Sequence, residues 1–582
     1  MLAFSQANVH LPLKDIMMIQ LHASRTLLAT AIASTLLVGC GGSGGKSKPT
    51  INNSSISSLA ATGSSSSYSS TAISSSSASS NSSASILAAK LTSLAKDATE
   101  MVPGNTLTAQ STCTSCDPGK TQYQWFIEGN PDPVSVTNSY QFQPADRLKK
   151  LTIVATPYSL IGVKGVSETL VLDRKQVKSI VSNSLAFAAL KSDGSGVITW
   201  GASPYGRNYG GDSSGIDLAN VASVVGNSGA FAAMKTNGSV VTWGNSSDGG
   251  DSTNLDLTNV ANVVANSYAF AAIKTNGSVV TWGYGDYGGD SSSIDLTAVV
   301  NVVGNGNAFA AIKIDGSVVT WGDSYSGGDS SGKDLTGVVS VVGNGSAFAA
   351  IKANGSVVTW GYAGSGGDSS GKDLTGVVSV VGNSRAFVAI KANGSVVTWG
   401  DSSYGGDSSG INLTDVARVV ANYTAFAAIK TNGSVVTWGD SSDGGDSSGK
   451  DLTSVVSVVG NGSAFAAIKA NGSVVTWGDS RYGGDSSGRV LTEVTSVVGN
   501  TGAFAATKAN GSVVTWGHSK YGGDTSSQDL THVASVVACS NRFAALKDNG
   551  DVLTWGDFGY GGESDGIDFG AEDFIVSSTL NP

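Results

Sequence analysis

Short apolar runs separated by Gly-, Asn- and Ser-rich turns fill the chain from about residue 175 onward. The pattern returns ten times, and a typical copy reads VVSVVGNGSAFAAIKANGSVVTWGDSxxGGDSSGKDLTG. The Trp residues of successive copies lie 39 residues apart after a first interval of 43. They are Trp200, Trp243, Trp282, Trp321, Trp360, Trp399, Trp438, Trp477, Trp516 and Trp555. A fixed period of this length indicates stacked repeats rather than one irregular core.

Each copy predicts three antiparallel β-strands. VVSVV is a β-branched run typical of a buried strand, and AFAAIK and SVVTWG flank an Asn-Gly pair such as Asn237-Gly238. Asn-Gly between apolar runs is a strong hairpin signal, and we expect a type I′ turn with positive φ at both residues. Because a three-stranded sheet leaves an apolar face uncovered, each copy needs its neighbours for stability.

Ten such units, at residues 175–582, predict an all-β fold in which each repeat is one blade of a β-propeller. The segment AFAAIKxNGSVVTWGDSxYGGD resembles the regulator-of-chromosome-condensation repeat family. The compact period is similar to the propellers of the same superfamily that include beta-lactamase-inhibitor protein II. We expect one closed ring, although a seven-bladed ring with extra blades and an open spiral stay possible. The run Asp573–Ser577 resembles an eleventh first strand, which ring closure by shared strands would use.

The resemblance has two departures. The His that commonly precedes the second strand in that family is absent, and GGDSS stands where the family has GQLG. Guanine-nucleotide exchange, which one eukaryotic member performs, is therefore not expected here.

The N-terminal segment resembles a bacterial lipoprotein signal. Residues 26–38 form an apolar run of 13 residues after Arg25, too short for a membrane-spanning helix and typical of a signal peptide. Residues 37–40, LVGC, resemble a lipobox, which implies cleavage after residue 39 and acylation of Cys40. Gly41 favours the outer membrane by the same resemblance. An ordinary secretory signal that contains a Cys is the alternative.

A Ser- and Gly-rich segment at residues 40–96 follows, with too few apolar residues to repay the entropy of ordering, and predicts a disordered tether. Residues 97–174 have strand-like runs and one Trp, which predict a small immunoglobulin-like β-sandwich. The candidate strands are Thr106–Thr112, Gln122–Glu128, Ser139–Phe142, Lys150–Pro157 and Glu168–Leu172. Cys113 and Cys116 form a C-x-x-C pair, for which we favour a local disulfide over a redox or zinc motif.

Composition narrows the function classes. The formal net charge is −10 and no basic stripe is visible, so we expect no nucleic-acid partner. Only 4 His and 4 Cys are present, which argues against a metalloenzyme or a His-dependent hydrolase. We therefore expect no enzyme activity, no catalytic residue, no metal and no cofactor.

Two features could carry binding. A Gly-Gly-acidic loop recurs in every copy, and its carboxylates could hold Ca²⁺ or, as we favour, could cap backbone N–H groups. They are Asp212, Asp251, Asp290, Asp329, Asp368, Asp407, Asp446, Asp485, Asp524 and Glu563. Variation gathers between Trp-Gly and Gly-Gly, where Tyr is frequent, as on adaptable recognition surfaces. The candidate binding residues are Tyr209, Tyr287, Tyr404, Tyr482, Tyr521 and Tyr560, although each could instead cover its own blade.

Together these features predict a cell-envelope protein, held to a membrane by a lipid anchor, that binds a protein or glycan through its rim loops. One alternative is a stoichiometric inhibitor or assembly platform for an envelope enzyme. A polysaccharide-acting enzyme is the other, and an Asp or Tyr constellation unique to one blade would mark it.

Overall fold

The computed structural model describes residues 90–96, 104–143, 146, 149–174, 177–192, 194–201, 208–526, 528–548, 550–557, 564, 567 and 574–578. The expected signal peptide, Cys40 and the tether up to residue 89 lie outside these ranges. The described residues form β-strands joined by turns and single-turn helices, so the all-β prediction is confirmed. None of the described helices is both long and apolar enough to cross a membrane.

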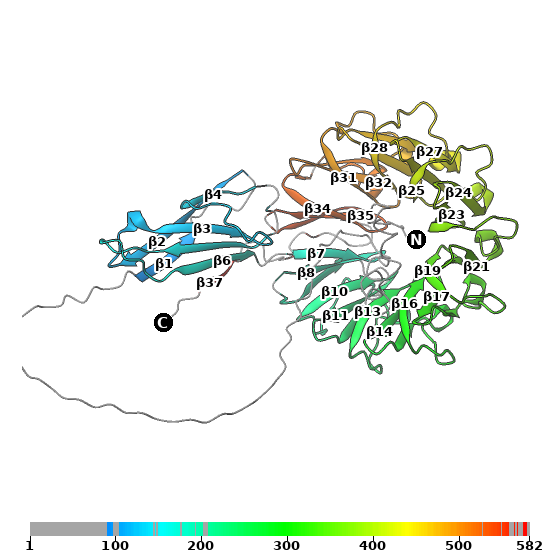
Figure 1. The fold of residues 1–582 in the computed structure, drawn as a ribbon, viewed down its shortest axis with the longest axis horizontal. Helices are drawn as coiled ribbons and strands as arrows, with labels where there is room; N and C mark the ends of the chain where they lie inside the picture. The colour runs from blue at the N-terminus through cyan, green and yellow to red at the C-terminus, as the bar shows by residue number, and fades with distance from the viewer. Residues whose placement is uncertain are drawn as a thin grey trace, which may run out of the picture.

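Ten three-stranded antiparallel sheets, numbered here as repeats 1 to 10, follow one another around a common centre (Figure 1). The first strands are β7 Val177–Ser182, β10 Val221–Gly226, β13 Val260–Ala265, β16 Val299–Gly304, β19 Val338–Gly343, β22 Val377–Gly382, β25 Val416–Ala421, β28 Val455–Gly460, β31 Val494–Gly499 and β34 Val533–Ala538. The second strands are β8 Ala186–Lys191, β11 Ala230–Lys235, β14 Ala269–Lys274, β17 Ala308–Lys313, β20 Ala347–Lys352, β23 Ala386–Lys391, β26 Ala425–Lys430, β29 Ala464–Lys469, β32 Ala503–Lys508 and β35 Arg542–Lys547. The third strands are β9 Val197–Gly201, β12 Val240–Gly244, β15 Val279–Gly283, β18 Val318–Gly322, β21 Val357–Gly361, β24 Val396–Gly400, β27 Val435–Gly439, β30 Val474–Gly478, β33 Val513–Gly517 and β36 Val552–Gly556.

The hairpin between the second and third strands is not the expected type I′ turn. Gly238 has a φ of +78°, but Asn237 is absent from the residues with positive φ. The Lys235 N–H donates to the Ser239 carbonyl and the Gly238 N–H to the Lys235 carbonyl. This pattern fits a type I turn closed by a left-handed Gly, because the loop is one residue longer than a type I′ hairpin allows.

The aromatic side chains of each repeat stack on each other and are buried against the preceding repeat. In repeat 5, Phe348 is the cross-strand partner of Trp360, with ring centres 5.3 Å apart. Both rings pack on the small side chains Ala308 and Ala310 of repeat 4. The Trp360 Nε1–H donates to the carbonyl of Gly327 in repeat 4 at 3.0 Å. Burying an aromatic side chain of this kind stabilises the fold by about 1.5–3 kcal/mol, so adjacent repeats stabilise each other.

Repeat 10 packs against repeat 1 in the same manner. Phe187 and Trp200 of repeat 1 share a buried cluster with Ala544 and Leu546 of repeat 10. The Ser182 hydroxyl donates to the Ala538 carbonyl at 3.1 Å, so strands β7 and β34 are also linked directly.

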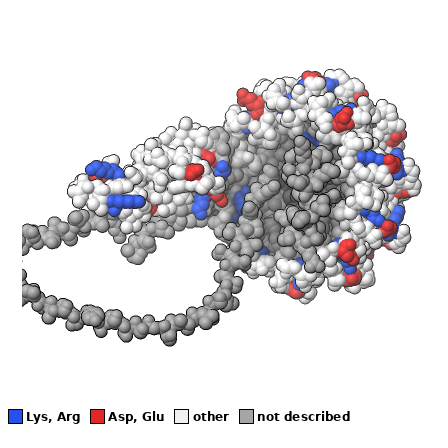
Figure 2. Space-filling model, in the orientation of Figure 1, with Lys and Arg blue, Asp and Glu red and all other residues white. Residues whose placement is uncertain are grey.

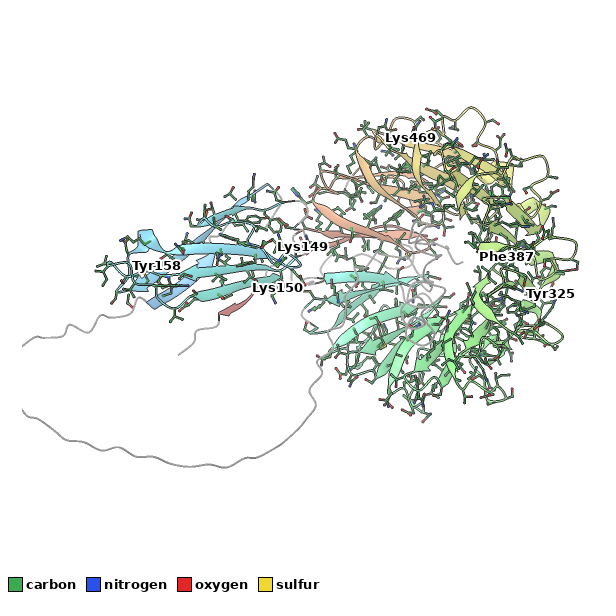
Figure 3. All side chains as sticks on the ribbon, viewed as in Figure 1. Lys149, Lys150, Tyr158, Tyr325, Phe387 and Lys469 are labelled. Carbon is green, nitrogen blue, oxygen red and sulfur yellow. A yellow bond between two sulfur atoms is a disulfide. The ribbon has the colours of Figure 1, made fainter. Side chains whose placement is uncertain are left out.

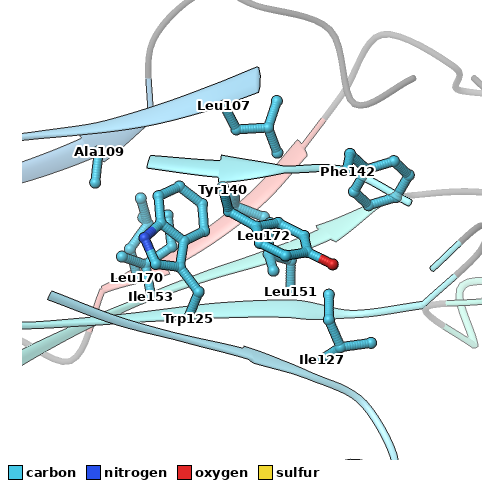
Figure 4. Close-up of a cluster of buried hydrophobic side chains, with 10 residues drawn as sticks. All are labelled: Leu107, Ala109, Trp125, Ile127, Tyr140, Phe142, Leu151, Ile153, Leu170 and Leu172. Carbon is cyan, nitrogen blue, oxygen red and sulfur yellow. The ribbon is translucent and has the colours of Figure 1, made fainter. Parts of the chain in front are cut away.

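Two further sheets form a small two-sheet module. One contains β1 Lys90–Lys96, β2 Thr106–Thr114 and β4 Ser139–Gln141, and the other contains β3 Gln122–Ile127, β5 Leu151–Thr156, β6 Glu168–Arg174 and β37 Phe574–Ser578. These strands precede the repeats in the sequence, except for the last strand, β37, which follows them. Their facing side chains, including Trp125, form one buried core (Figure 4). The five expected strands are present, and the helix η1 Pro118–Lys120 lies between β2 and β3.

Two boundaries differ from the sequence prediction. Strand β1 begins at Lys90, inside the segment expected to be tether, and pairs with β2. Strand β37, expected to supplement the repeats, instead pairs antiparallel with β6. Its short apolar run, FIV, fits either edge, so the sequence pattern did not distinguish the two partners.

The repeats expose two different ends. We call the end with the Lys-x-Asn-Gly turns the hairpin face, and the end with the first-to-second-strand turns and the loops after the third strands the loop face. Near the hairpin face, the Lys that ends a second strand pairs with an Asp of the preceding repeat, as Lys352 does with Asp334 at 2.6 Å. Figure 2 shows acidic and basic side chains interspersed around the repeats, without a continuous basic patch in this view.

Candidate binding surface on the loop face

In repeats 2 to 9, where the structure describes both, the loop face is built from two short segments. One is the turn between the first and second strands, such as residues 344–346, and the other is a single-turn helix after the third strand. These helices are η4 Ser246–Asp248, η5 Gly285–Tyr287, η6 Ser324–Ser326, η7 Ala363–Ser365, η8 Ser402–Tyr404, η9 Ser441–Gly445, η10 Ser480–Tyr482 and η11 Ser519–Tyr521. Most of the sequence variation between repeats falls in these segments.

A buried Asn joins the two segments in repeats 1 to 9. In repeat 5, the Asn344 Nδ2–H donates to the Ser365 carbonyl at 2.6 Å. The Asn344 Oδ1 accepts the N–H groups of Ser346 at 3.0 Å and Ala347 at 2.8 Å. The equivalent residues are Asn183, Asn227, Asn266, Asn305, Asn383, Asn422, Asn461 and Asn500. The sequence analysis gave this Asn no role, although its 39-residue period was a signal that could have identified it.

Glycines fix the end of each helix on the neighbouring repeat. Gly366 ends η7 with a φ of +91°, and a Cβ there would lie 2.7 Å from the Phe387 ring of repeat 6. Gly367 has no room either, because its Cβ would lie 2.2 Å from the Gly361 carbonyl oxygen. The first Gly of the pair therefore serves packing between repeats, and the second allows the loop to approach the third strand of its own repeat.

The carboxylate after the Gly-Gly pair caps its own loop. Asp368 Oδ1 accepts the Ser370 N–H at 2.9 Å and the Ser370 hydroxyl, and these bonds hold the pKa of Asp368 below its ordinary value. The same i to i+2 bond is present from Asp212 to Asp524. Glu563 lies outside the described residues. Within the described ranges, no three His, Cys, Asp or Glu side chains gather as a metal site would require.

The tyrosines singled out from the sequence are half-buried. Each described member of this set lies directly before the Gly-Gly pair, and its backbone carbonyl accepts the Nδ2–H of the buried Asn of its repeat, which we call the clamp Asn. The described members are Tyr209, Tyr287, Tyr404, Tyr482 and Tyr521. Tyr404 and Tyr521 also contact buried clusters of their repeats. Tyr560 lies outside the described residues. The structure thus gives these rings a packing role beside any role in binding.

Other tyrosines of the loop face are more exposed. Tyr325 is 60% exposed, Tyr423 47%, Tyr284 43%, Tyr362 38% and Tyr268 37%. Figure 3 shows Tyr325 near the outer edge of the repeats, whereas the buried Phe387 lies further in. All five belong to repeats 3 to 5 and 7, so they occupy one arc of the loop face.

Four of the five exposed rings, all but Tyr423, lie in two aromatic groups. Tyr325 of repeat 4 and Tyr362 of repeat 5 stack with ring centres 4.5 Å apart, and their hydrogen bond raises the pKa of Tyr325. In repeat 3, Tyr287 lies 4.8 Å from Tyr284 and 5.2 Å from Tyr268. Because the rings support each other, they present aromatic faces without much loss of side-chain entropy on binding.

Two repeats place an arginine on a tyrosine ring of this face. In repeat 6 the Arg385 guanidinium lies 5.1 Å from the centre of the Tyr404 ring, with Nη1 3.8 Å from Asp401 Oδ2. In repeat 8 the Arg481 guanidinium lies 5.4 Å from the Tyr482 ring. Its Nε and Nη2 donate to the two carboxylate oxygens of Asp479 at 3.1 and 2.6 Å.

Asp443 is the one acidic residue of the described loop face whose pKa is clearly raised. Burial is the main cause, while hydrogen bonds from Thr424 and Ser463 oppose it. The Thr424 hydroxyl donates to Asp443 Oδ2 at 2.7 Å. Ser463 belongs to the next repeat, so this carboxylate links repeats 7 and 8 and has a structural role.

Repeat 10 departs from the other nine. Cys539 replaces the clamp Asn, and Arg542 replaces the Ala that begins the second strand elsewhere. Arg542 is buried and donates through Nε to the Asp557 carbonyl at 2.6 Å and through Nη1 to the Leu185 carbonyl of repeat 1 at 3.1 Å. Burial raises the pKa of the Cys539 thiol, as expected for a packed residue. The unusual pair therefore stabilises the contact between repeats 10 and 1.

The remaining cysteines lie away from this surface. Cys113 and Cys116 form a disulfide at the end of β2, with their Cα atoms 5.9 Å apart. They lie in the two-sheet module, and neither contributes to the loop face.

No family model matches the chain, and no curated protein matches it. Among solved structures, it is similar to Prp20p of Saccharomyces cerevisiae, with 16% identity and a TM-score of 0.28 over 47% of this chain and 75% of that one. The CRINKLY WD40 ectodomain of the Arabidopsis thaliana receptor kinase ACR4 has 19% identity and a TM-score of 0.25, over 45% and 95% of the two chains. The WD40 β-propeller domain of Doa1 has 13% identity and a TM-score of 0.20, over 43% and 88%.

Structural neighbours thus include RCC1 and WD40 propellers, and the repeated three-stranded sheets fit a propeller-like repeat. At identities below 25% and TM-scores below 0.5, these likenesses carry no argument about function.

Proposed function

We propose that the protein is a cell-envelope lipoprotein whose repeats form one closed propeller and bind a protein partner through the loop face, without catalysis. An immunoglobulin-like module would connect the propeller to the tether and its acylated Cys40. The chemistry of the surface favours binding, because the variable side chains are Tyr, Ser, Asp and Arg on a framework that does not vary.

One observation carries the proposal. All five exposed tyrosines of the described residues lie on the loop face, whereas the turn tips of the hairpin face repeat nearly the same polar Asn-Gly-Ser sequence. Tyr is enriched in protein interfaces because one ring supplies apolar area, a hydroxyl and little conformational entropy. A scaffold with no partner would have no physical reason to gather these rings at one end.

Ring closure would make the loop face a rigid platform. Repeats 10 and 1 share a buried cluster, and Arg542 bonds across their contact. Both observations support a closed ring, because an open spiral would leave these two apolar faces in water. A rigid ring pre-organises the loops and lowers the entropic cost of binding.

Site-specific photo-crosslinking tests the proposed face. A photoreactive phenylalanine analogue at Tyr325 samples the loop face, and the same analogue at the exposed Asn354 samples the hairpin face as a matched control. We expect one discrete crosslinked species in intact envelopes from position 325 and none from position 354. Equal crosslinking from both faces, or a crosslink to glycan alone, would contradict the proposal.

The lipid anchor is tested separately. The wild-type protein should enter the detergent phase in a temperature-induced phase separation, and the Cys40→Ser variant should stay in the aqueous phase. Retention of the variant in the detergent phase would refute acylation at Cys40.

A further inference from the structure

In two repeats a cation of the chain itself lies on a tyrosine ring of the loop face. In repeats 6 and 8 a guanidinium lies over a tyrosine ring and beside a carboxylate, as Arg385 and Arg481 do. Attraction to the face of the ring and a charge-assisted pair with the carboxylate act on the same cation. In these two repeats the chain supplies the cation itself.

The loops of repeats 3 and 4 also contain Asp and Tyr, at other loop positions than in repeats 6 and 8, and have no Lys or Arg of their own. Asp323 also caps its own loop, because it accepts the Tyr325 N–H and the Ser326 hydroxyl. Repeat 3 combines Asp286 with the stacked rings of Tyr284 and Tyr287, and repeat 4 combines Asp323 with Tyr325. The turn position that holds Arg385 in repeat 6 is Tyr268 in repeat 3 and Asn307 in repeat 4. Within the part of the chain that the structure describes, no Lys or Arg forms an ion pair with Asp286 or Asp323.

The charge of this arc matches a cationic ligand. The loop-face segments of repeats 3 to 7 contain the carboxylates of Asp286, Asp323, Asp401, Asp440 and Asp443, and one guanidinium, Arg385. Arg385 lies beside Asp401 and its charge also acts on Tyr325, while Asp443 is held in a contact between repeats 7 and 8. The remaining carboxylates are Asp286 and Asp323, beside the exposed rings of repeats 3 and 4, and Asp440. Such an arc attracts a basic segment and repels an acidic one, whereas a neutral glycan would gain nothing from the carboxylates.

We propose that the loop face of repeats 3 and 4 binds arginine side chains of a basic segment in a protein partner. The inference rests on the proposed binding function and specifies the chemistry of its partner. Tyr284 and Tyr325 would cover the guanidinium faces, while Asp286 and Asp323 would pair with their N–H groups. Tyr362, stacked on Tyr325, would hold that ring in place.

The chain itself provides conservative variants. We number the loop from the residue that follows Trp-Gly. Its first position is Asn245 in repeat 2, where Asn caps the helix η4, so Tyr284→Asn, Tyr362→Asn and Asp323→Asn introduce a residue that another repeat has at this position. Position three is Ser247 in repeat 2 and Ser403 in repeat 6, which supports Tyr325→Ser. Because these residues are tolerated in other repeats, the variants should fold, and the melting temperature checks that they do.

Titration of the full-length protein in mild detergent with short labelled peptides tests the chemistry. One peptide alternates Arg with Gly and Ser, a second has citrulline for every Arg, and a third has Glu. We expect the Arg peptide to bind at least about tenfold more tightly than the citrulline peptide, and binding to weaken between about 50 mM and 300 mM salt. The combined Tyr284→Asn, Tyr325→Ser and Tyr362→Asn variant should lose about tenfold in affinity.

Two further variants sharpen the test. Tyr482→Ser alters a ring that Arg481 already covers, so it should leave the affinity for the Arg peptide unchanged. Arg385→Ser introduces the residue found at this position in repeats 5 and 8 and uncovers Tyr404 and Asp401, so it should raise the affinity or the number of bound peptides about twofold.

Equal binding of the citrulline peptide, equal loss in the Tyr482→Ser variant, or weaker binding in Arg385→Ser would overturn the inference. Failure of the Arg peptide to bind, while a protein still crosslinks at position 325, would remove the arginine chemistry alone. Absence of both would remove the proposed function as well.

Discussion

Replacing Asn344 with Ala removes three hydrogen bonds that connect the first turn of repeat 5 to its variable loop. The amide donates to the Ser365 carbonyl and accepts the N–H groups of Ser346 and Ala347. Asn344 is 0% exposed, so water cannot replace the lost partners without local opening. The Tyr362 N–H also donates to the Ser346 carbonyl at 2.9 Å, so the variant tests how far the loop depends on the Asn344 side chain beyond this backbone bond.

The expected loss follows from the groups left without a partner. A buried donor or acceptor without a hydrogen bond costs about 1–3 kcal/mol. The Ala347 N–H and the Ser365 carbonyl meet this condition fully, and the Ser346 N–H only in part. We therefore expect Asn344→Ala to lower the free energy of opening of repeat 5 by about 2–5 kcal/mol.

The control is an Asn of the same repeat with similar local geometry but full access to water. Asn354 Oδ1 accepts the Ser356 N–H at 3.0 Å and the Ser356 hydroxyl at 2.8 Å on the exposed hairpin face. Asn354→Ala should lower the free energy of opening by about 0.5 kcal/mol, because solvent satisfies the freed groups.

Native-state hydrogen exchange suits this comparison, since repeat proteins need not unfold in one step. Amides of β19 to β21 should exchange much faster in Asn344→Ala, with a smaller change in repeats 1 and 10. If Asn344→Ala and Asn354→Ala accelerate exchange in repeat 5 equally, the clamp argument is wrong.

Three further predictions concern the framework. Ala298 has a φ of +56°, where repeats 5 and 6 begin with Gly337 and Gly376, so Ala298→Gly should stabilise the protein by about 1 kcal/mol in thermal unfolding. Arg542→Ala removes the donor to the Leu185 and Asp557 carbonyls. It should lower the free energy of opening of repeats 1 and 10, measured by hydrogen exchange, by about 3 kcal/mol. Unchanged exchange rates in these two repeats would contradict the role of Arg542 in their contact. Asp256, Asp334 and Asp373 pair with Lys near the hairpin face, and the bonds from Lys and from a neighbouring Thr lower the pKa of each to about 2. Their stabilisation is therefore present above about pH 4 and lost as the pH falls toward 2, so the melting temperature should fall across that window, and less so at high salt.

The strands and their grouping were predictable from the sequence because they depend on patterns within one repeat. Alternation and the Asn-Gly pair locate AFAAIK and VVTWG without knowledge of any other repeat. The turn type was not predictable from the Asn-Gly pair alone. It depends on whether the strands continue to Lys235 and Ser239, and a one-residue difference in loop length changes it.

The exposed residues of the loop face were harder to predict because exposure depends on contacts between segments. Tyr287 and Tyr284 differ by three positions in one loop, yet only the first has its carbonyl bound by Asn266 and its ring covered on two sides. Tyr268 and Tyr423 lie in the other segment, which the search for variation between Trp and Gly-Gly did not include. The partner of β37 likewise depends on which edge is free, and a strand pattern does not contain that information.

Whether a position is invariant or variable among the repeats depends on whether its contacts use side-chain or backbone atoms. The Phe, Trp and Gly-Gly contacts between repeats depend on side-chain shape, because a Cβ at Gly366 would lie only 2.7 Å from the Phe387 ring. The buried Asn binds only backbone N–H and carbonyl groups, so Asn344 holds a loop that begins with Tyr in repeat 5 and Asn383 makes the same bond to a loop that begins with Asp in repeat 6. The exposed side chains of the loop face, unlike Tyr404, Tyr521 and Asp443, can therefore change with little effect on folding, and selection for a partner can act on them one repeat at a time. The same argument explains why repeat 10, where Cys539 replaces the clamp, depends on a buried side-chain cation, Arg542, for its contact with repeat 1.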